Sequence, residues 1–347
     1  MDTGKVIDAD GHAMDYAEIY SEYLEEPYVR RGRGSATNVP VAAWYPVEVY
    51  SRNMDQTLGK PGRDLKERLS DMDLQEIDVA VLYPTFGLFI SQIKEKGYAA
   101  ALCRAYNNWI ADQCKQSPRL KAVALLPVAV PEECPKELNR AVTRLGLLGA
   151  MLSASGLHRS YADSAYFPLY EEAQRLNVPL AVHASGGDDF GSELLPSFIA
   201  THTCGHPFPV LRHLTAMVFE GLPELFPRLT LGFLEIGCGW LPYWMERMDE
   251  EYEKRAREAP LLKGKPSEYL TGGRLYYSCE PDEKMVGTVV DMIGPDRIMY
   301  ASDYPHWDMT YPESAALINK RHDLSDEAKR KILCDNAHRF YPALTDV

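Results

Sequence analysis

The sequence predicts a (β/α)₈ barrel, and two observations favour this fold. Eight short runs of β-branched and apolar residues alternate with longer amphipathic stretches, which is typical of βα units around a parallel sheet. The length of 347 residues suits a barrel of this kind built as one domain. An open, doubly wound sheet is the competing interpretation, but no Gly-x-Gly-x-x-Gly motif follows the first run. We therefore expect a single α/β domain over residues 1–347.

The predicted strands and helices follow one another in the order that a barrel requires. We expect strands over 6–10, 78–84, 120–128, 149–155, 179–185, 229–237, 274–280 and 297–303. We expect helices over 65–76, 99–116, 134–145, 166–176, 210–222, 241–255, 283–293 and 325–340. The last helix opens with Ser325, a suitable N-cap, followed by two acidic residues in its first turn.

Two segments are longer than a minimal barrel needs. Residues 13–63 form an insertion after the first strand, and their many aromatic residues favour an ordered cap over the C-terminal face of the barrel. The sequence leaves open whether this cap covers its own barrel or that of a neighbouring subunit. Residues 186–209 follow the fifth strand and end in His-Thr-Cys-Gly-His-Pro, on the face where barrel active sites lie.

The overall charge and the cysteines limit the classes of function. The net charge of −13 argues against nucleic acid or an anionic membrane as a partner, because both need basic surfaces. The seven cysteines form no Cys-x-x-Cys pair, and their odd number fits reduced thiols. The sequence shows neither a signal-peptide pattern nor an apolar run of membrane-spanning length, so we expect a cytoplasmic protein.

Residues able to bind a metal stand at the C-terminal ends of several predicted strands. Asp10 and His12 alternate along the first strand and therefore point to the same side of the sheet. A lone histidine or aspartate at such a place is more often structural, but two imidazoles and two carboxylates together can hold one divalent ion. The polar residues at the strand ends are Asp10, His12, His183, Glu235, Glu280 and Asp303.

Four stretches resemble one known family. These are residues 8–12 (Asp-Ala-Asp-Gly-His), 226–235 (Phe-Pro-Arg-Leu-Thr-Leu-Gly-Phe-Leu-Glu), 300–306 (Tyr-Ala-Ser-Asp-Tyr-Pro-His) and 335–341 (Asp-Asn-Ala-His-Arg-Phe-Tyr). They look like the amidohydrolase superfamily, in its amidohydrolase-related branch, which includes aminocarboxymuconate-semialdehyde decarboxylase and the hydroxybenzoate decarboxylases. The resemblance spans nearly the whole chain and implies a metal-dependent barrel enzyme.

The resemblance implies four metal ligands, and the residues near them offer three candidate acid–base groups. The ligands are Asp10, His12, His183 and Asp303, with Asp10 in the place of a more usual histidine. Asp303, Glu235 and His206 are the candidate acid–base residues, and Glu235 again stands where many decarboxylases of the branch carry a histidine. We expect one divalent metal ion, with Zn²⁺ preferred, while the extra carboxylate also makes Mn²⁺ or Fe²⁺ suitable.

The preferred function is non-oxidative decarboxylation of an aromatic or conjugated carboxylic acid. The alternative is a metal-dependent hydrolase of a C–N, C–O or C–C bond, which uses the same ligands. A barrel without catalysis is disfavoured because all four ligand residues are present. Arg52 could clamp a carboxylate and Trp44 could stack on a ring, with His306 and Glu280 as further substrate contacts. The expected partner is a small carboxylic acid, and we expect a homodimer because related barrels often pair.

Overall fold

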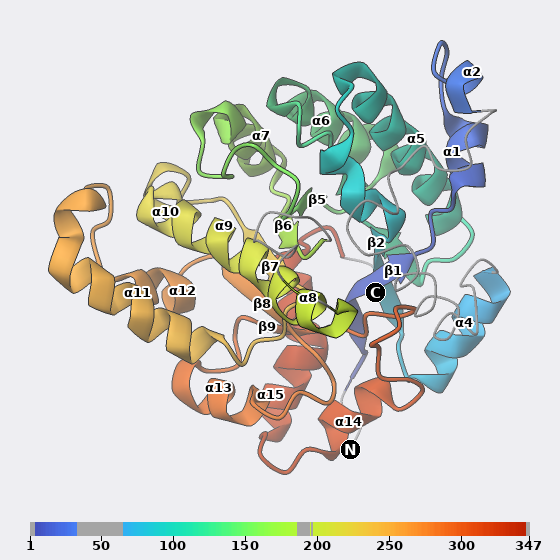
Figure 1. Cartoon of the computed structure of the whole chain (residues 1–347). Coiled ribbons are helices and arrows are strands. Elements are labelled where there is room, and N and C mark those ends of the chain that lie inside the picture. Colours follow the sequence, from blue (N-terminus) through green and yellow to red (C-terminus); the bar gives the residue numbers. More distant parts are fainter. Residues whose placement is uncertain (1–3, 33–64, 186–194, 196, 345–347) are drawn as a thin grey trace.

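The computed structural model describes residues 4–32, 65–185, 195 and 197–344, and its strands lie at the centre of the molecule with helices around them (Figure 1). The strands are β1 (Ile7–Ala13), β2 (Val79–Pro84), β3 (Leu120–Ala122), β4 (Ala124–Leu125), β5 (Ala150–Ser153), β6 (Leu180–His183), β7 (Leu231–Leu234), β8 (Leu275–Cys279) and β9 (Ile298–Tyr300). Every paired neighbour is parallel, in the orders β1-β2-β3 and β4 to β9.

Backbone hydrogen bonds join these two sheets into a closed barrel. β3 and β4 are two parts of the one predicted strand, separated only by Val123, whose N–H donates to the Leu82 carbonyl at 3.2 Å. At the opposite seam, the Asp303 N–H donates to the Asp10 carbonyl at 3.1 Å and the His12 N–H donates to the Tyr304 carbonyl at 2.7 Å. These bonds connect β1 with the segment that follows β9, and the predicted barrel of eight strand positions is confirmed.

The helices cover the outside of the barrel in the predicted alternation (Figure 1). The predicted helices are found as α4 (Leu65–Leu74), α5 (Lys96–Cys114), α6 (Cys134–Leu145), α7 (Phe167–Leu176), α9 (Pro207–Phe219), α11 (Leu241–Arg255), α13 (Val286–Ile293), and α15 (Asp326–Arg330) with α16 (Asn336–Phe340). Ser325 is the N-cap of α15, as predicted, and its hydroxyl accepts from the Ala328 N–H. A π-helical turn, η6 (Lys331–Asp335), joins α15 to α16.

Several short helices were not predicted from the sequence. They are α1 (Ala17–Tyr23), α2 (Val29–Gly32), α8 (Phe198–Gly205), α10 (Leu222–Leu225), α12 (Pro266–Gly272) and α14 (Ser314–Lys320), with the turns η1 (Phe86–Gln92), η2 (Pro131–Glu133), η3 (Ser164–Tyr166) and η5 (Ala256–Glu258). Most are too short to show a clear apolar period. Among the described residues, none of the helices is long and apolar enough to cross a membrane.

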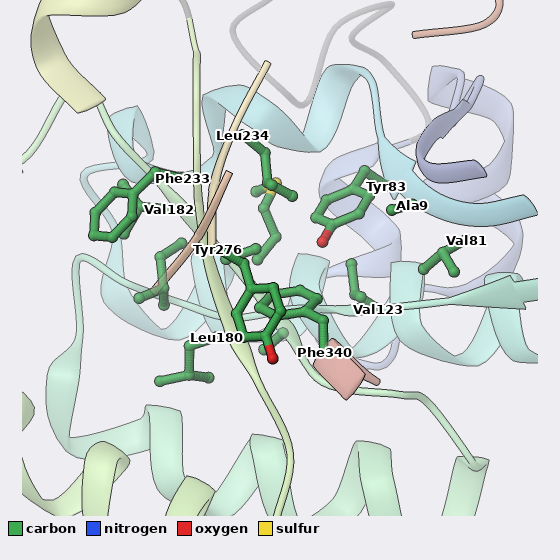
Figure 2. Packing of buried hydrophobic residues seen from close by; sticks show 14 of the residues in the cluster. Ala9, Val81, Tyr83, Val123, Leu180, Val182, Phe233, Leu234, Tyr276 and Phe340 are labelled. Carbon is green, nitrogen blue, oxygen red and sulfur yellow. The ribbon is translucent and has the colours of Figure 1, made fainter. Parts of the chain in front are cut away.

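The barrel interior is filled by aromatic and aliphatic side chains, several of which Figure 2 labels. Phe340, at the end of α16, packs against Tyr276 of β8, with ring centroids 5.2 Å apart. Gly232 of β7 makes room for it, because a Cβ there would lie 2.7 Å from Phe340 Cζ. The adjacent Tyr341 donates to the Ala9 carbonyl at 3.0 Å, so the end of the last helix packs against strands β1, β7 and β8.

The described start of the long insertion runs along the side of the barrel. Tyr23 of α1 donates to Asp112 of α5 at 3.3 Å, and Glu25 pairs with Arg104 of the same helix. Figure 1 shows α1 and α2 beside α5 at the edge of the molecule. Residues 33–64 of the insertion lie outside the described residues, so the predicted cap stays a prediction.

Candidate metal and active site

Acidic and imidazole side chains converge at the C-terminal ends of the barrel strands. Two groups can each hold an ion, because their ligand atoms lie within 4.8 Å of one another. One group is Asp10, His12 and His183, and the other is His12, Glu235, Asp303 and His306. His12 belongs to both, so the two groups form one continuous cluster across strands β1, β6, β7 and β9.

The strand β1 supplies Asp10 and His12 from a locally irregular backbone. The pairing of β1 with β2 shifts between Asp8 and Gly11. A Cβ at Gly11 would lie 2.5 Å from Asp8 Oδ2. The Asp8 carboxylate accepts from the Ser302 N–H at 2.9 Å and from the Ser302 hydroxyl at 2.6 Å, which ties β1 to the segment after β9. Glycine is therefore needed between the two ligand residues.

The imidazole orientations leave nitrogen lone pairs for an ion. His12 Nδ1 lies 3.0 Å from the Pro84 carbonyl and must carry its proton there, which leaves His12 Nε2 free as an acceptor. His183 Nδ1 lies 2.8 Å from the Ala184 carbonyl, while its Nε2 lies 3.0 Å from Asp10 Oδ1. Two acceptors at that distance repel each other unless a proton or a cation lies between them.

Glu235 directly follows β7 and Asp303 lies three residues after β9, both in a left-handed backbone conformation. Their φ angles are 62° and 55°, values that residues with a side chain rarely adopt and that cluster at functional sites. The Ser278 hydroxyl accepts from the Glu235 N–H at 2.9 Å. The Asp303 N–H is held by the Asp10 carbonyl, so both strained residues are fixed by neighbouring strands.

Three histidines surround the Glu235 carboxylate. His183 Nδ1 lies 3.1 Å from Oε2, His306 Nδ1 lies 3.1 Å from Oε1, and His12 Nε2 lies 3.6 Å from Oε1. His306 also lies 2.6 Å from Asp303 Oδ1, and its other nitrogen is 3.2 Å from the Thr85 hydroxyl. His306, predicted as a substrate contact, therefore sits inside the cluster and joins its two carboxylates.

The surroundings of Asp303 and Glu235 shift the pKa values of the two carboxyl groups in opposite directions. Burial raises the pKa of Asp303 well above its ordinary value, and the negative charge of Glu235 adds to this rise against the opposing effect of His306. Burial also acts to raise the pKa of Glu235, but the charge and hydrogen bonds of His183 and the hydrogen bond of His306 outweigh it and hold that pKa well below its ordinary value. Such a separation is typical of paired acid–base groups.

The cluster fits one divalent cation. Among the described residues, His12 Nε2, Glu235 Oε2 and Asp303 Oδ1 are buried atoms with no hydrogen bond of regular geometry, although imidazole nitrogens lie 3.1 Å from Glu235 Oε2 and 2.6 Å from Asp303 Oδ1. Buried polar atoms without regular hydrogen bonds are costly, and three of them in one cluster point to a missing ligand. The carboxylates of Asp10, Glu235 and Asp303 lie close together, and a cation would offset their mutual repulsion.

His206, a predicted acid–base residue, lies next to Glu235 at the junction of α8 and α9. Its Nε2 lies 2.7 Å from the Glu235 carbonyl and 3.8 Å from Glu235 Oε2. The imidazole of His202, one helical turn earlier, lies 4.4 Å from that of His206 between ring centroids. Phe198 and Trp307 pack on His202 at 5.4 and 5.2 Å, so an aromatic rim stands next to the cluster.

The described cluster does not include the remaining predicted site residues. Arg52 and Trp44 fall outside the described residues. Glu280 belongs to neither ligand group, and its exposed side chain follows β8. Desolvation by the surrounding protein, together with the negative charges of Glu283 and Asp308, raises the pKa of Glu280 to about 7.

Sequence reasoning assigned no role to three residues at the site. These residues are Phe198, His202 and Thr85, and none of them was a candidate ligand or acid–base group in the sequence. The spacing of four between His202 and His206 was the available signal, because such residues share one face of a helix.

Comparisons with known proteins show the family of this chain. The family model described as amidohydrolase matches residues 7–343. A gamma-resorcylate decarboxylase from Polaromonas sp. is 26% identical over 266 residues, which cover 73% of this chain and 79% of that protein. A 2-keto-4-carboxy-3-hexenedioate hydratase from Sphingobium sp. is 23% identical over 362 residues, covering 98% of this chain and 96% of that protein.

A solved structure shows the same fold. The 5-carboxyvanillate decarboxylase of Novosphingobium aromaticivorans, in complex with manganese and 4-hydroxy-3-methoxy-5-nitrobenzoic acid, superposes with a TM-score of 0.81. It is 22% identical in sequence, and the match covers 98% of this chain and 97% of that one. The family model spans almost the whole chain, and the fold agrees with it. The protein described here therefore belongs to the amidohydrolase family.

Proposed function

We propose that this protein is a metal-dependent, non-oxidative decarboxylase of an aromatic carboxylic acid. The observation that carries the proposal is the cluster itself, in which buried ligand atoms of His12, Glu235 and Asp303 gather and the Asp303 carboxyl group can hold a proton. The gamma-resorcylate and carboxyvanillate decarboxylases among its relatives support the same reaction class. The proposal assigns the reaction class of these relatives to this chain, with the residues of the cluster as metal ligands and acid–base groups.

Asp10, His12, His183 and Asp303 would hold the ion, as the sequence predicts, and Glu235 lies close enough to join them. When bound, a divalent ion supplies Lewis acidity that gathers the substrate carboxylate and a neighbouring oxygen. The predicted preference for Zn²⁺ stays a prediction. The carboxylate-rich ligand set equally suits Mn²⁺, the ion in the carboxyvanillate decarboxylase structure.

Asp303 is placed to deliver the proton that decarboxylation needs. The ring carbon that carries the carboxylate takes up a proton, its bond to that carboxylate breaks, and the bonding electrons return to the ring as CO₂ leaves. Asp303 is the most accessible of the three clustered carboxylates, with 15% of its side chain exposed against 7% for Glu235 and 1% for Asp10. His306, 2.6 Å from Asp303 Oδ1, orients this carboxyl group.

The residues near Asp303 also suggest how an aromatic ring is held. Phe198 and Trp307 lie 5.5 Å apart between ring centroids, at 67°, and present aromatic surface next to His202 and His206. An aromatic acid can stack on such a surface while its carboxylate faces the cluster. The sequence-based proposals for Arg52 and Trp44, and for a cap formed by the insertion, concern residues outside the described part of the chain.

Substrate turnover tests the proposal directly. The purified protein is loaded separately with Mn²⁺ and with Zn²⁺, and each form is incubated with 2,6-dihydroxybenzoate, 5-carboxyvanillate and their amides. Release of CO₂ and the decarboxylated phenol are measured in parallel with ammonia release from the amides. We expect metal-dependent CO₂ release from at least one acid and no ammonia release.

Two outcomes would contradict this function. Ammonia release without CO₂ would favour the hydrolase that the sequence left open. Hydration of an unsaturated keto acid, without CO₂ release from any aromatic acid, would favour the hydratase reaction, which is the activity of the relative that spans 98% of this chain.

A further inference from the structure

A cavity of about 580 Å³ opens at the end of the barrel opposite to the metal cluster. Its wall includes Leu231 and Leu275, the first residues of β7 and β8, whereas the cluster lies beyond the last residues of the strands. Phe226 and Tyr276 add aromatic surface to the same wall. This cavity is therefore separate from the candidate active site.

Three arginines line the cavity, and none of its described lining residues is acidic. The guanidinium groups belong to Arg274, Arg297 and Arg339, which come from the starts of two strands and from α16. The chain as a whole carries a net charge of −13, so this local excess of positive charge is the reverse of the overall balance. Like charges gathered around one cavity repel each other unless an anion offsets them.

The hydrogen bonds of two of these arginines, Arg274 and Arg297, leave their charges uncompensated. Arg297 donates to the Tyr276 hydroxyl at 2.8 Å, and its buried Nε has no hydrogen-bond partner among the described residues. Its guanidinium also lies 5.0 Å from the centroid of the Tyr276 ring. Arg274 donates to the Thr230 hydroxyl at 3.3 Å. Both arginines are thus bound to neutral groups.

Two carboxylates neighbour the lining residues in the sequence, and of the three arginines only Arg339 pairs with one of them. Asp296 lies 3.0 Å from Arg339 and equally 3.0 Å from Lys331, so one carboxylate is shared by two cations. Glu224 pairs with Lys263 and accepts a hydrogen bond from Tyr269 at 2.6 Å. Neither carboxylate lines the cavity, and neither contacts Arg274 or Arg297 in the described part of the chain.

We propose that this cavity binds a small organic anion through a carboxylate or phosphate group. Guanidinium groups donate in a planar fork that matches both groups, and the apolar wall offers surface for a hydrocarbon or aromatic portion. The site lies away from the metal cluster, so binding there is independent of the proposed decarboxylation. The cavity is then a second anion-binding site, at the end of the barrel to which our proposal assigns no catalytic residue.

Substitution of the two arginines without a carboxylate partner tests the site. The double variant Arg274→Gln with Arg297→Gln is compared with Arg144→Gln, which removes one positive charge from an exposed position on α6. Isothermal titration of the metal-loaded proteins uses inorganic phosphate, benzoate and the neutral benzamide as separate probes. We expect at least about tenfold weaker binding of phosphate or benzoate in the double variant alone, because charge-assisted hydrogen bonds are lost.

Chemical protection gives a second readout that needs no substitution. Phenylglyoxal modifies accessible guanidinium groups, and peptide mapping by mass spectrometry reports each arginine. We expect benzoate or phosphate to protect Arg274, Arg297 and Arg339 while Arg144 reacts unchanged, and the more protective anion identifies the group that the site prefers. Equal modification with and without both anions, or equal protection by benzamide, would overturn the proposal.

Discussion

At the scale of single residues, the site depends on how each side chain is fixed by its neighbours. His12 is oriented by the Pro84 carbonyl, and the nitrogen that this leaves unpartnered faces the carboxylates. The sequence predicted Asp10, His12, His183 and Asp303 as one set, whereas the structure places Asp10 and His183 in one ligand group and Asp303 in the other, with His12 in both. The sequence could not reveal that His306 bridges Asp303 and Glu235, because that contact depends on the backbone path after β9.

The role of His183 as a metal ligand can be tested by removing its imidazole. We expect His183→Ala to weaken metal binding by about 100-fold or more, since loss of even an outer-shell partner costs 10–100-fold. Metal content after dialysis, measured by mass spectrometry, reports the loss. The exposed His158→Ala serves as the matched control, and circular dichroism confirms folding. Full metal retention by the His183 variant would remove this residue from the ligand set.

The charge of Glu235 can be removed with little change of shape. We expect Glu235→Gln to lower kcat by roughly 10²–10⁴-fold while KM changes much less, because the imidazoles of His183 and His306 lose the anion that orients them. Steady-state kinetics with the best substrate of the panel provide the measurement. An unchanged kcat would show that Glu235 has a structural role only.

At the scale of elements, the strands were predicted more accurately than the segments between them. Buried parallel strands appear in the sequence as continuous apolar runs, so their positions could be predicted. The helices α8 and α12 are too short to show a helical period of apolar residues, so they could not. The predicted strands over 229–237 and 297–303 extend past the ends of β7 and β9, and within these extensions the backbone has a positive φ at Glu235 and at Asp303. No periodicity in the sequence reports such a turn.

The contact between β7 and α16 allows a stability test. We expect Gly232→Ala to lower the free energy of unfolding by about 1–3 kcal/mol, because the new methyl group would lie 2.7 Å from Phe340 Cζ. Urea unfolding followed by fluorescence measures the change. Gly272→Ala, where a Cβ meets no atom within 4 Å, is the control and should leave stability nearly unchanged. An equal effect of both substitutions would contradict this packing.

The junction between β1 and η1 makes folding sensitive to pH. Asp15 accepts from the N–H groups of Thr85, Phe86 and Gly87 and from the Tyr20 hydroxyl, and burial raises its pKa to about 6. The folded state therefore holds this proton more tightly than the unfolded chain does. The contribution of Asp15 to folding is most favourable below about pH 4 and declines as the pH rises to about 6.

Comparison with Asp15→Asn isolates this contribution. The stability advantage of the wild type over the variant should shrink by about 3 kcal/mol between pH 4 and pH 7, which corresponds to about two pKa units. Urea unfolding at several pH values measures the difference. A constant or growing advantage across this range would show that the pKa of Asp15 is not raised.

At the scale of the whole molecule, family, fold and metal cluster support one another. The sequence resemblance predicted a barrel and a metal-dependent enzyme, and the family match and the closed strand order confirm the family and the fold. The relatives support the predicted decarboxylase activity and a divalent metal ion. The substrate and the assembly state depend on pocket shape and on surfaces, which motifs at strand ends do not encode.

The origin of the proton tests the central claim most directly. The Mn²⁺-loaded protein is incubated in D₂O with an aromatic acid that carries ¹³C in its carboxyl group, and NMR follows both products. The account predicts ¹³CO₂ together with a phenol carrying one deuteron at the ring carbon that lost the carboxyl group, both abolished when the metal is removed. Retention of the ¹³C label in the ring compound, or CO₂ release that persists without metal, would contradict it.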